Sequence, residues 1–250
     1  MTEIPVSHPR YESLVTREKI SQAMKDGIVH ETGLIAHGRG EAFDYLIGEK
    51  THEIALIAEK VACAALLYAK NPVISINGNV AALVAKDCIN LGKSIPAKLE
   101  VNLFHRTQFR IENISNILLN QGAKKVYGIN ANARISGLEH DRSLCDRKGI
   151  YSADAVLIPL EDGDRCFALK KMNKRVITID LNPLSRTART ADITIVDNIT
   201  RAIANIQKWV YDLKGNKKDE LKVIIENWDN EKNLEKMINF ISKRLNSMFR

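Results

Sequence analysis

The sequence predicts an α/β protein with a doubly wound, mostly parallel sheet, preceded by an N-terminal helical segment and followed by a C-terminal helical tail. Two observations carry this prediction. Short continuous runs of Val, Ile and Leu recur along residues 71–213, and such runs are typical of strands that are buried on both faces. Stretches with helical spacing of apolar residues lie between the runs, and this alternation favours a Rossmann-like core.

Residues 1–70 are expected to form the helical segment and to pack on the core. Ser7 is a candidate helix cap, Pro9 suits a first helical turn, and Gly27 is a plausible stop for the first helix.

Three glycines within residues 33–40 (GLIAHGRG) predict a loop, and a short helix is expected to follow over residues 41–47. Thr51 is then expected to cap a longer helix. Alanines recur along one face of this helix and permit close packing, with a subunit interface as one place for it.

The α/β core is expected over residues 71–213. The expected strands are 73–76, 99–104, 126–129, 155–160, 176–180 and 193–196, and the expected helices are about 80–92, about 107–120, one that ends near 172 and about 199–213. Residues 130–150 show no clear period and are expected to be a polar loop.

Residues 214–250 predict a basic tail of two amphipathic helices. The last 50 residues hold 11 Lys and Arg against 7 Asp and Glu. Their net charge of +4 is more than half of the net charge of +7 that the whole chain carries. One apolar stripe consists of Leu234, Met237, Ile238, Ile241 and Leu245. We interpret the stripe as the face of a packed helix, and we expect the tail to lie outside the active site.

Composition and charge exclude several classes of protein. The body of the chain is nearly balanced in charge, which argues against a nucleic-acid partner although the pI is about 9.2. No apolar run is long enough for a membrane partner. The four cysteines, Cys63, Cys88, Cys145 and Cys166, form no CxxC pair, so a zinc ribbon is not expected. We expect a cytoplasmic protein.

Ligands of open parallel sheets bind beyond the carboxyl ends of the strands, so the residues that follow each strand are the candidates for a site. Asn77, Gly78 and Asn79 follow the first strand and suit either an anion site at a helix N-terminus or a plain helix cap, and the sequence leaves both open. His105 and Arg106 follow the second strand as a cationic pair, although a solvated helix residue explains Arg106 slightly better.

Three carboxylates follow the fourth strand, in the segment Glu161-Asp162-Gly163-Asp164-Arg165. They suit Mg²⁺ or a substrate ammonium, but one of them is expected to be a helix cap, and a metal role is the less favoured interpretation.

The strongest local signal is the connector over residues 180–192, DLNPLSRTARTAD. It joins two expected strands without helical periodicity, and connectors of this length are usually functional. Its two arginines and three hydroxyls suit phosphate, and Asp180 suits a ribose hydroxyl. An exposed basic loop is the less favoured alternative. No P-loop, GxSxG elbow, HExxH or kinase motif is present. The residues therefore indicate a Rossmann-like enzyme or binder for phosphorylated ligands.

A more specific likeness is carried by several long motifs. They are IPVSHPRYESLVTREK, GLIAHGRGEAFDYLIGEKT, ISINGNVAALV, EVNLFHRT, GIYSADAVLIPLEDGDR and VITIDLNPLSRTARTADITIVDNITRAI. With these motifs the chain resembles the archaeal phosphopantothenate synthetases, also called 4-phosphopantoate–β-alanine ligases, from about residue 4 to residue 210. The tail and the loop around 130–148 contribute little to the resemblance.

The resemblance implies an ATP-dependent amide ligase of coenzyme A biosynthesis. Such an enzyme condenses (R)-4-phosphopantoate with β-alanine to 4′-phosphopantothenate, AMP and diphosphate through a phosphopantoyl adenylate. It also implies a homodimer, ATP as a substrate and, because negative charge gathers around the α-phosphorus, Mg²⁺. A non-catalytic nucleotide sensor on the same fold is the alternative.

The family's nucleotide contacts carry over onto matching positions of this sequence. They are Arg17, Arg39, Asp180, Leu181, Asn182, Arg186, Thr187, Asn198 and Ile199. Substrate contacts rest on the strand-end argument alone, with Asn77, Asn79 and Arg106 as candidates. Neither the catalytic group nor the metal ligands can be assigned from the sequence.

Overall fold

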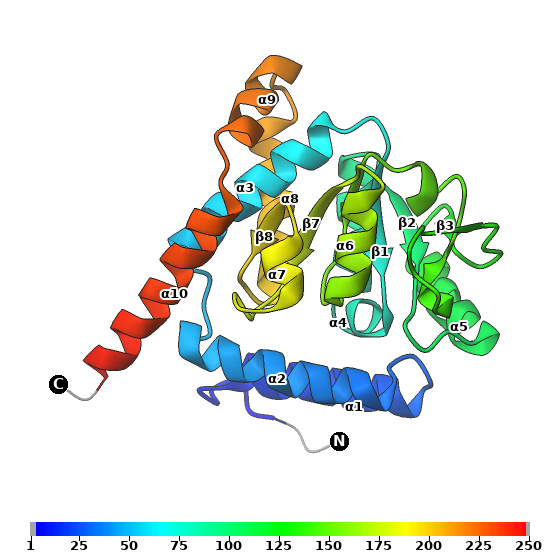
Figure 1. Cartoon of the computed structure of the whole chain (residues 1–250). Coiled ribbons are helices and arrows are strands. Elements are labelled where there is room, and N and C mark those ends of the chain that lie inside the picture. Colours follow the sequence, from blue (N-terminus) through cyan, green and yellow to red (C-terminus); the bar gives the residue numbers. More distant parts are fainter. Residues whose placement is uncertain (1–3, 249–250) are drawn as a thin grey trace.

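Six parallel strands form the central sheet of the protein, in the order β3-β2-β1-β6-β7-β8. The computed structural model describes residues 4–248 (Figure 1). The strands of the sheet are β1 (Pro72–Ile76), β2 (Lys98–Val101), β3 (Val126–Tyr127), β6 (Ala155–Leu157), β7 (Arg175–Ile179) and β8 (Ile193–Ile195). All five neighbouring pairs are parallel, so the expected sheet and all six of its strands are confirmed.

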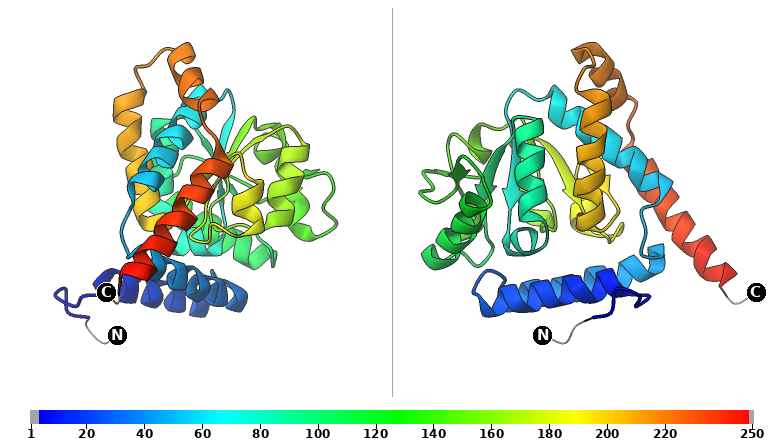
Figure 2. Two further views of the ribbon diagram at one scale, coloured as in Figure 1. Left: turned by 60° about the vertical axis from the view of Figure 1, so that its left-hand side comes forward. Right: turned by 180° about the vertical axis from the view of Figure 1, so that it is seen from behind.

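Helices cover both faces of the sheet, as a doubly wound fold requires (Figures 1 and 2). The helices are α1 (Tyr11–Lys25), α2 (Glu31–Ile47), α3 (Glu53–Tyr68), α4 (Gly78–Ser94), α5 (Gln108–Asn120), α6 (Gly163–Lys171), α7 (Arg186–Thr190), α8 (Ile199–Leu213), α9 (Lys218–Glu226) and α10 (Asn230–Ser247). The crossovers through α4 and α6 leave β1 and β6 side by side, and the connections from these two strands run in opposite directions across the sheet. This arrangement makes the β1–β6 boundary a topological switch point.

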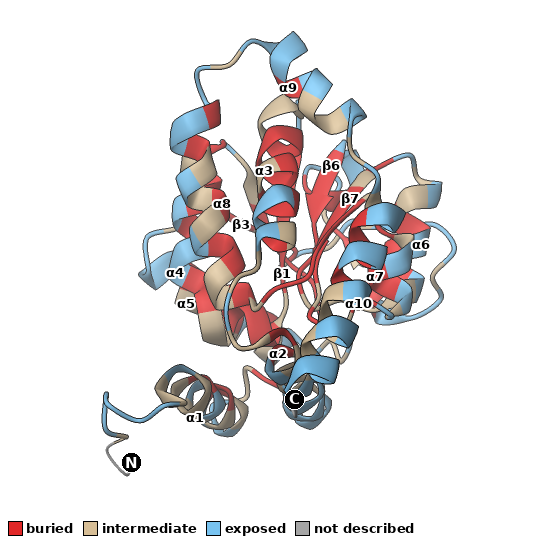
Figure 3. Cartoon of the chain, turned by 90° about the vertical axis from the view of Figure 1, so that its left-hand side faces the viewer, coloured by how far each residue is buried: buried red, intermediate tan, exposed pale blue. Residues whose placement is uncertain are grey.

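The core explains why the strands read as continuous apolar runs. All five residues of β1 are buried, because helices pack on both of its faces (Figure 3). Helix α3 buries its alanines in the same core, where it packs on α8. The Ala-rich face is therefore used within the chain and not across a subunit interface.

Helix α2 corrects the expectation of a glycine loop over residues 33–40. It is continuous from Glu31 to Ile47 and lies with α1 across the carboxyl edge of the sheet (Figure 1). Gly33 serves close packing, because a Cβ at this position would clash with the side-chain oxygen of Asn79 on α4. The helix ends only at Gly48, whose φ of 103° is favourable for glycine.

Two predicted caps are also wrong. Helix α1 begins at Tyr11 with Arg10 at its N-cap, so Ser7 and Pro9 lie before it. The N-cap of α3 is His52, because the hydroxyl of Thr51 instead donates to Asp197 at 2.6 Å.

Two expected loops contain regular structure. Residues 130–150 hold the antiparallel pair β4 (Ala133–Arg134) and β5 (Leu144–Cys145). The connector over 180–192 holds the short helix α7, which Ser185 caps by accepting from the amide of Ala188 at 2.9 Å. Five residues are too few for a visible period, which explains why the sequence predicts no helix there.

The tail forms the two expected helices. Leu234 and Met237 of α10 are buried and pack in one cluster with Leu181 and Ala188 of the connector, whereas Ile238 and Leu245 stay exposed. The packed-face interpretation is confirmed for the buried part of the stripe. The tail therefore packs directly on the connector, whereas none of its residues lines the cavity described below, so its expected place outside the active site stays a prediction. Among residues 4–248, none of the helices has both the length and the apolar character needed to cross a membrane.

Candidate functional site

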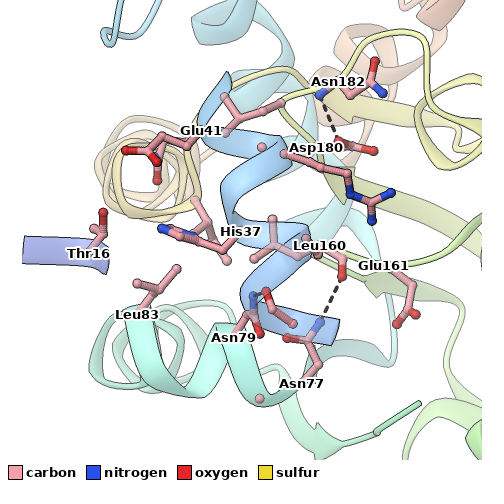
Figure 4. A pocket seen from close by; sticks show the side chains of 18 of the residues that line it. Thr16, His37, Glu41, Asn77, Asn79, Leu83, Leu160, Glu161, Asp180 and Asn182 are labelled. Carbon is pink, nitrogen blue, oxygen red and sulfur yellow. Dashed lines mark hydrogen bonds between the residues drawn. The ribbon is translucent and has the colours of Figure 1, made fainter. Parts of the chain in front are cut away.

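A cavity of about 960 Å³ lies between the carboxyl edge of the sheet and helix α2. Figure 4 shows how α2 divides its lining, with Asp180 and Asn182 on one side and Thr16 and Leu83 on the other. The cavity thus takes residues from the ends of β1, β2, β6, β7 and β8, which is where ligands of doubly wound folds bind.

Asn77 joins the two halves of the sheet at the switch point. Its Nδ2 donates to the carbonyls of Pro159 (3.0 Å) and Leu160 (3.2 Å), and its Oδ1 caps α4 by accepting from the amide of Val80 (3.0 Å) (Figure 4). The helix-cap interpretation of Asn77 is confirmed, while its anion-site role stays a prediction. Asn79 ties α2 to the same helix, because its Nδ2 donates to the carbonyl of Gly33 at 2.8 Å.

The end of β7 supplies a fixed carboxylate. Asp180 accepts from the amide of Asn182 at 2.9 Å (Figure 4). It also accepts from the hydroxyl of Ser185. Burial raises the pKa of Asp180, although these hydrogen bonds and the charge of Arg39 oppose the rise. Thr187 donates from its hydroxyl to the carbonyl of Glu161 at 2.7 Å, so the connector is tied to the end of β6.

The end of β8 is tied to α2 by a charged network. Asn198 caps α8 and donates to Asp44 at 3.0 Å. Arg201 donates to both Asp44 and the fully buried Asp197 at 2.6 Å. Burial raises the pKa of Asp197, and the charge of Arg201 opposes this rise. Ile199 and Asn198 consequently face the cavity from a rigid helix start.

Helix α2 contributes side chains that sequence reasoning missed. The Nε2 atom of His37 is buried and has no hydrogen-bond partner within residues 4–248, and burial lowers the pKa of this imidazole. Glu41 also lines the cavity, but Ser13, Arg10 and Arg17 of the N-terminal segment bind its carboxylate. Had the HGRG segment been predicted as helical and not as a loop, both residues would have been placed on α2.

The three carboxylates after β6 are each paired with arginine. Glu161 pairs with the buried Arg165, Asp162 pairs with Arg142, and Asp164 pairs with both Arg142 (3.4 Å) and Arg186 (2.6 Å). The expected helix cap in this segment is Asp162, which accepts from the first amides of α6. Burial raises the pKa of Glu161 to about 7, against the opposing charge of Arg165. In the described part of the chain no three His, Cys, Asp or Glu side chains are grouped as a metal site.

The structure brings together most of the residues predicted for nucleotide and substrate. Those that line the cavity are Arg39, Asn77, Asn79, Asp180, Leu181, Asn182, Thr187, Asn198 and Ile199.

Three other predicted residues do not line the cavity. Arg17 binds Glu41 at 2.9 Å, Arg186 binds Asp164 on the surface, and Arg106 donates to the carbonyl of Gly128 at 2.6 Å. Any role for these arginines at a ligand stays a prediction.

Comparison with known proteins gives a consistent result. The sequence profile of the phosphopantothenate/pantothenate synthetase family matches residues 54–244. A protein of Methanosarcina mazei named 4-phosphopantoate–beta-alanine ligase is 54% identical over 248 residues, which is 99% of this chain and 98% of that protein. Proteins with the same name from Thermococcus onnurineus (99% of this chain, 95% of that protein) and Thermococcus kodakarensis (98% and 94%) are each 53% identical. The likeness thus continues through the tail, beyond the expected limit near residue 210.

Proposed function

The chain belongs to the phosphopantothenate/pantothenate synthetase family, and from this membership we propose that it condenses (R)-4-phosphopantoate with β-alanine at the expense of ATP. The products are 4′-phosphopantothenate, AMP and diphosphate, formed through a phosphopantoyl adenylate in coenzyme A biosynthesis. A non-catalytic nucleotide sensor is not favoured, because the curated relatives share the name of a ligase.

The lining of the cavity supports the proposal. Seven of the nine residues predicted for the nucleotide line one cavity, although they come from α2, the ends of β7 and β8, and α7. In the proposal, Asp180, Asn182 and Asn198 hold the nucleoside, because they offer amide and carboxylate groups to its hydroxyls. Arg39 and Thr187 face the phosphates.

The chemistry follows from the poor leaving group of a free carboxylate. In the first step the carboxylate oxygen of phosphopantoate bonds to the α-phosphorus, and the bond to diphosphate breaks. In the second step the free amine of β-alanine bonds to the acyl carbon, AMP leaves, and the amine releases a proton. Positive groups that are fixed around the α-phosphorus stabilise the first transition state without reorganisation.

Mg²⁺ enters this proposal with the nucleotide. The three carboxylates nearest the switch point pair with Arg142, Arg165 and Arg186, so the side chains present do not fit a metal site of their own. An ion held by the phosphates of ATP would neutralise charge there, and such ions commonly need few protein ligands.

The proposal includes a homodimer and a cytoplasmic location. Helix α2 exposes Leu34 and Ile35, and α3 exposes Ile57, so apolar side chains are available for a second copy of the chain. Light scattering on the purified protein tests this assembly by giving the mass of two chains.

Product analysis tests the reaction. Purified protein with ATP, phosphopantoate and β-alanine should form AMP and 4′-phosphopantothenate in equal amounts, and AMP formation should depend on phosphopantoate. Formation of ADP and phosphate would instead indicate an acyl phosphate and would refute the adenylate. Nucleotide binding without turnover would favour the sensor.

A further inference from the structure

The cavity differs in charge between its two ends. Near the ends of β7 and β8 each carboxylate of the lining has a cation beside it, because Arg201 pairs with Asp44 and the charge of Arg39 acts on Asp180. Beneath β2 the lining includes the side chains of His30, His105 and Arg110, which we call the basic end. These three residues lie before α2, after β2 and in the first turn of α5, so the fold alone brings them together.

Arg110 is a partly buried cation without a carboxylate partner. Its guanidinium donates to the carbonyls of His105 and Ile28, and its Nε is buried and unpaired within residues 4–248. No carboxylate oxygen of the described chain lies within 4.0 Å of it, whereas Arg142 and Arg165 are both paired with carboxylates that follow β6. Burial lowers the pKa of Arg110, with no acidic side chain opposing it. A bound anion would offset this cost of burial.

The two histidines add donors beside this guanidinium. Their rings are stacked with centroids 3.7 Å apart and an interplanar angle of 19°. Nδ1 of His30 accepts from the amide of Thr32, so the neutral ring carries its proton on Nε2 and can donate it to a ligand. The pKa of His105 is lowered by burial and by His30, Arg110 and His140, which reflects the positive surroundings of this end.

The start of α4 lies against the same guanidinium. A Cβ on Gly78 would lie 3.1 Å from Nη2 of Arg110 and 2.5 Å from the carbonyl oxygen of Ile28, so only glycine allows this approach. The first turn of α4 carries partial positive charge from its free amides. A fixed cation, two imidazoles and a helix start therefore surround one end of the cavity.

We propose that His30, His105 and Arg110 bind the phosphate of the acyl substrate and thereby select phosphopantoate over pantoate. This inference rests on the proposed function. The acyl substrate carries an anion at each end, and its carboxylate must reach the α-phosphorus of a nucleotide that lies toward Asp180. Its phosphate then extends away from the nucleotide, toward the basic end, where a dianion finds more than one positive group.

The test compares two substrates that differ only in the phosphate. kcat/KM is measured with phosphopantoate and with pantoate for the wild type, His105→Ala, Arg110→Gln and a control, Lys124→Gln, which removes one exposed positive charge. The preference for phosphopantoate should fall about tenfold in His105→Ala and about a hundredfold in Arg110→Gln. In both variants kcat/KM should fall much less with pantoate than with phosphopantoate, whereas Lys124→Gln should match the wild type with both substrates.

The other outcomes separate the possible errors. An equal loss with both substrates would show a structural role and overturn the subsite. An unchanged preference in folded variants would also overturn it. His105→Ala keeps the inference testable if Arg110→Gln fails to fold, because the His105 side chain makes no hydrogen bond within residues 4–248. A wild type that uses neither substrate would refute the proposed function itself.

Discussion

Arg186 donates a hydrogen bond from Nη2 to Oδ1 of Asp164 at 2.6 Å, and both side chains stay largely exposed. This pair holds the arginine that sequence reasoning favours most for ATP at the rim of the site, beside the cavity-lining Thr187. An exposed ion pair contributes only about 0–1 kcal/mol to stability. Breaking the pair with Asp164, so that Arg186 can pair with a phosphate of the nucleotide, therefore costs little free energy. The guanidinium can therefore turn to the nucleotide when it binds.

Replacing Arg186 tests this exchange. If its guanidinium binds phosphate oxygens that gain charge in the transition state, Arg186→Ala should lower kcat/KM by about two to three powers of ten, or ~3–4 kcal/mol, without unfolding. Arg186→Lys should restore only part of the rate, because an ammonium cannot form the bidentate contact. Asp164→Asn should leave the rate near wild type or raise ATP affinity slightly. Normal turnover and ATP affinity in Arg186→Ala would remove Arg186 from the nucleotide site.

The strands and most helices could be predicted from sequence because their signals are local. The strands of the sheet lie in short segments rich in Val, Ile and Leu, and α8 has a clear amphipathic period. Helix α2 could not, because glycine disfavours a helix locally and only the contact between Gly33 and Asn79 shows why glycine is there. The basic end escapes sequence reasoning for another reason. His30, His105 and Arg110 have no common motif, and their meeting depends on the packing of α2 across the sheet.

Two glycines of α2 should respond oppositely to alanine. A Cβ on Gly33 would clash with the Asn79 side chain and break its 2.8 Å hydrogen bond, whereas a Cβ on Gly38 meets nothing within 4 Å. Gly33→Ala should cost about 1–3 kcal/mol of stability and lower activity, because a buried polar group loses its partner. Gly38→Ala should raise stability by up to about 1 kcal/mol through its better helix propensity, with activity kept.

Chemical denaturation and steady-state kinetics on both variants measure this contrast. If Gly38→Ala destabilised the protein as much as Gly33→Ala, the residues around 33–40 would not form the continuous helix described above.

Asn230 of the tail should matter for the nucleotide site. Its Oδ1 accepts from the amide of Thr194 at 2.8 Å, and its Nδ2 donates to the carbonyl of Ala188 at 3.0 Å. Asn230→Ala removes both bonds and should cost about 1–3 kcal/mol of stability. It should also raise KM for ATP, because Thr187 and Leu181 lie in the connector that these bonds hold. Asn246→Ala, an exposed change in the same helix, should have neither effect.

Truncation after Leu213 gives the stronger version of this test. It would uncover Leu181 and Ala188, which Leu234 and Met237 cover. Full turnover by a folded truncated protein would show that the tail does not support the site.

The last prediction concerns Glu59 and the pH dependence of stability. Glu59 is fully buried on α3, where Oε1 accepts from Asn205 at 3.4 Å and Oε2 has no partner within residues 4–248. Burial, with the charge of Asp197, raises the pKa of Glu59 from 4.5 to about 8. Between these two values the folded state keeps a proton that the unfolded state releases. The free energy of unfolding should therefore fall as pH rises through this window, by at most ~1.4 kcal/mol per pH unit from this group.

Glu59→Gln keeps the shape of the side chain and removes its titration. Urea unfolding at fixed protein concentration gives the free energy of unfolding of Glu59→Gln and of wild type at each pH. The difference between the two proteins should be nearly constant below pH 5. Between pH 5 and pH 8 it should change steadily in favour of Glu59→Gln. Other buried carboxyls titrate here too, since burial raises the pKa of Glu100 to about 7, so the difference between variant and wild type is the quantity to follow. Glu235→Gln on the exposed face of α10 serves as the control, with a difference that stays flat. A difference equally flat for Glu59→Gln would mean that Glu59 is already ionised in the folded protein at neutral pH, with water or a conformational change solvating its carboxylate.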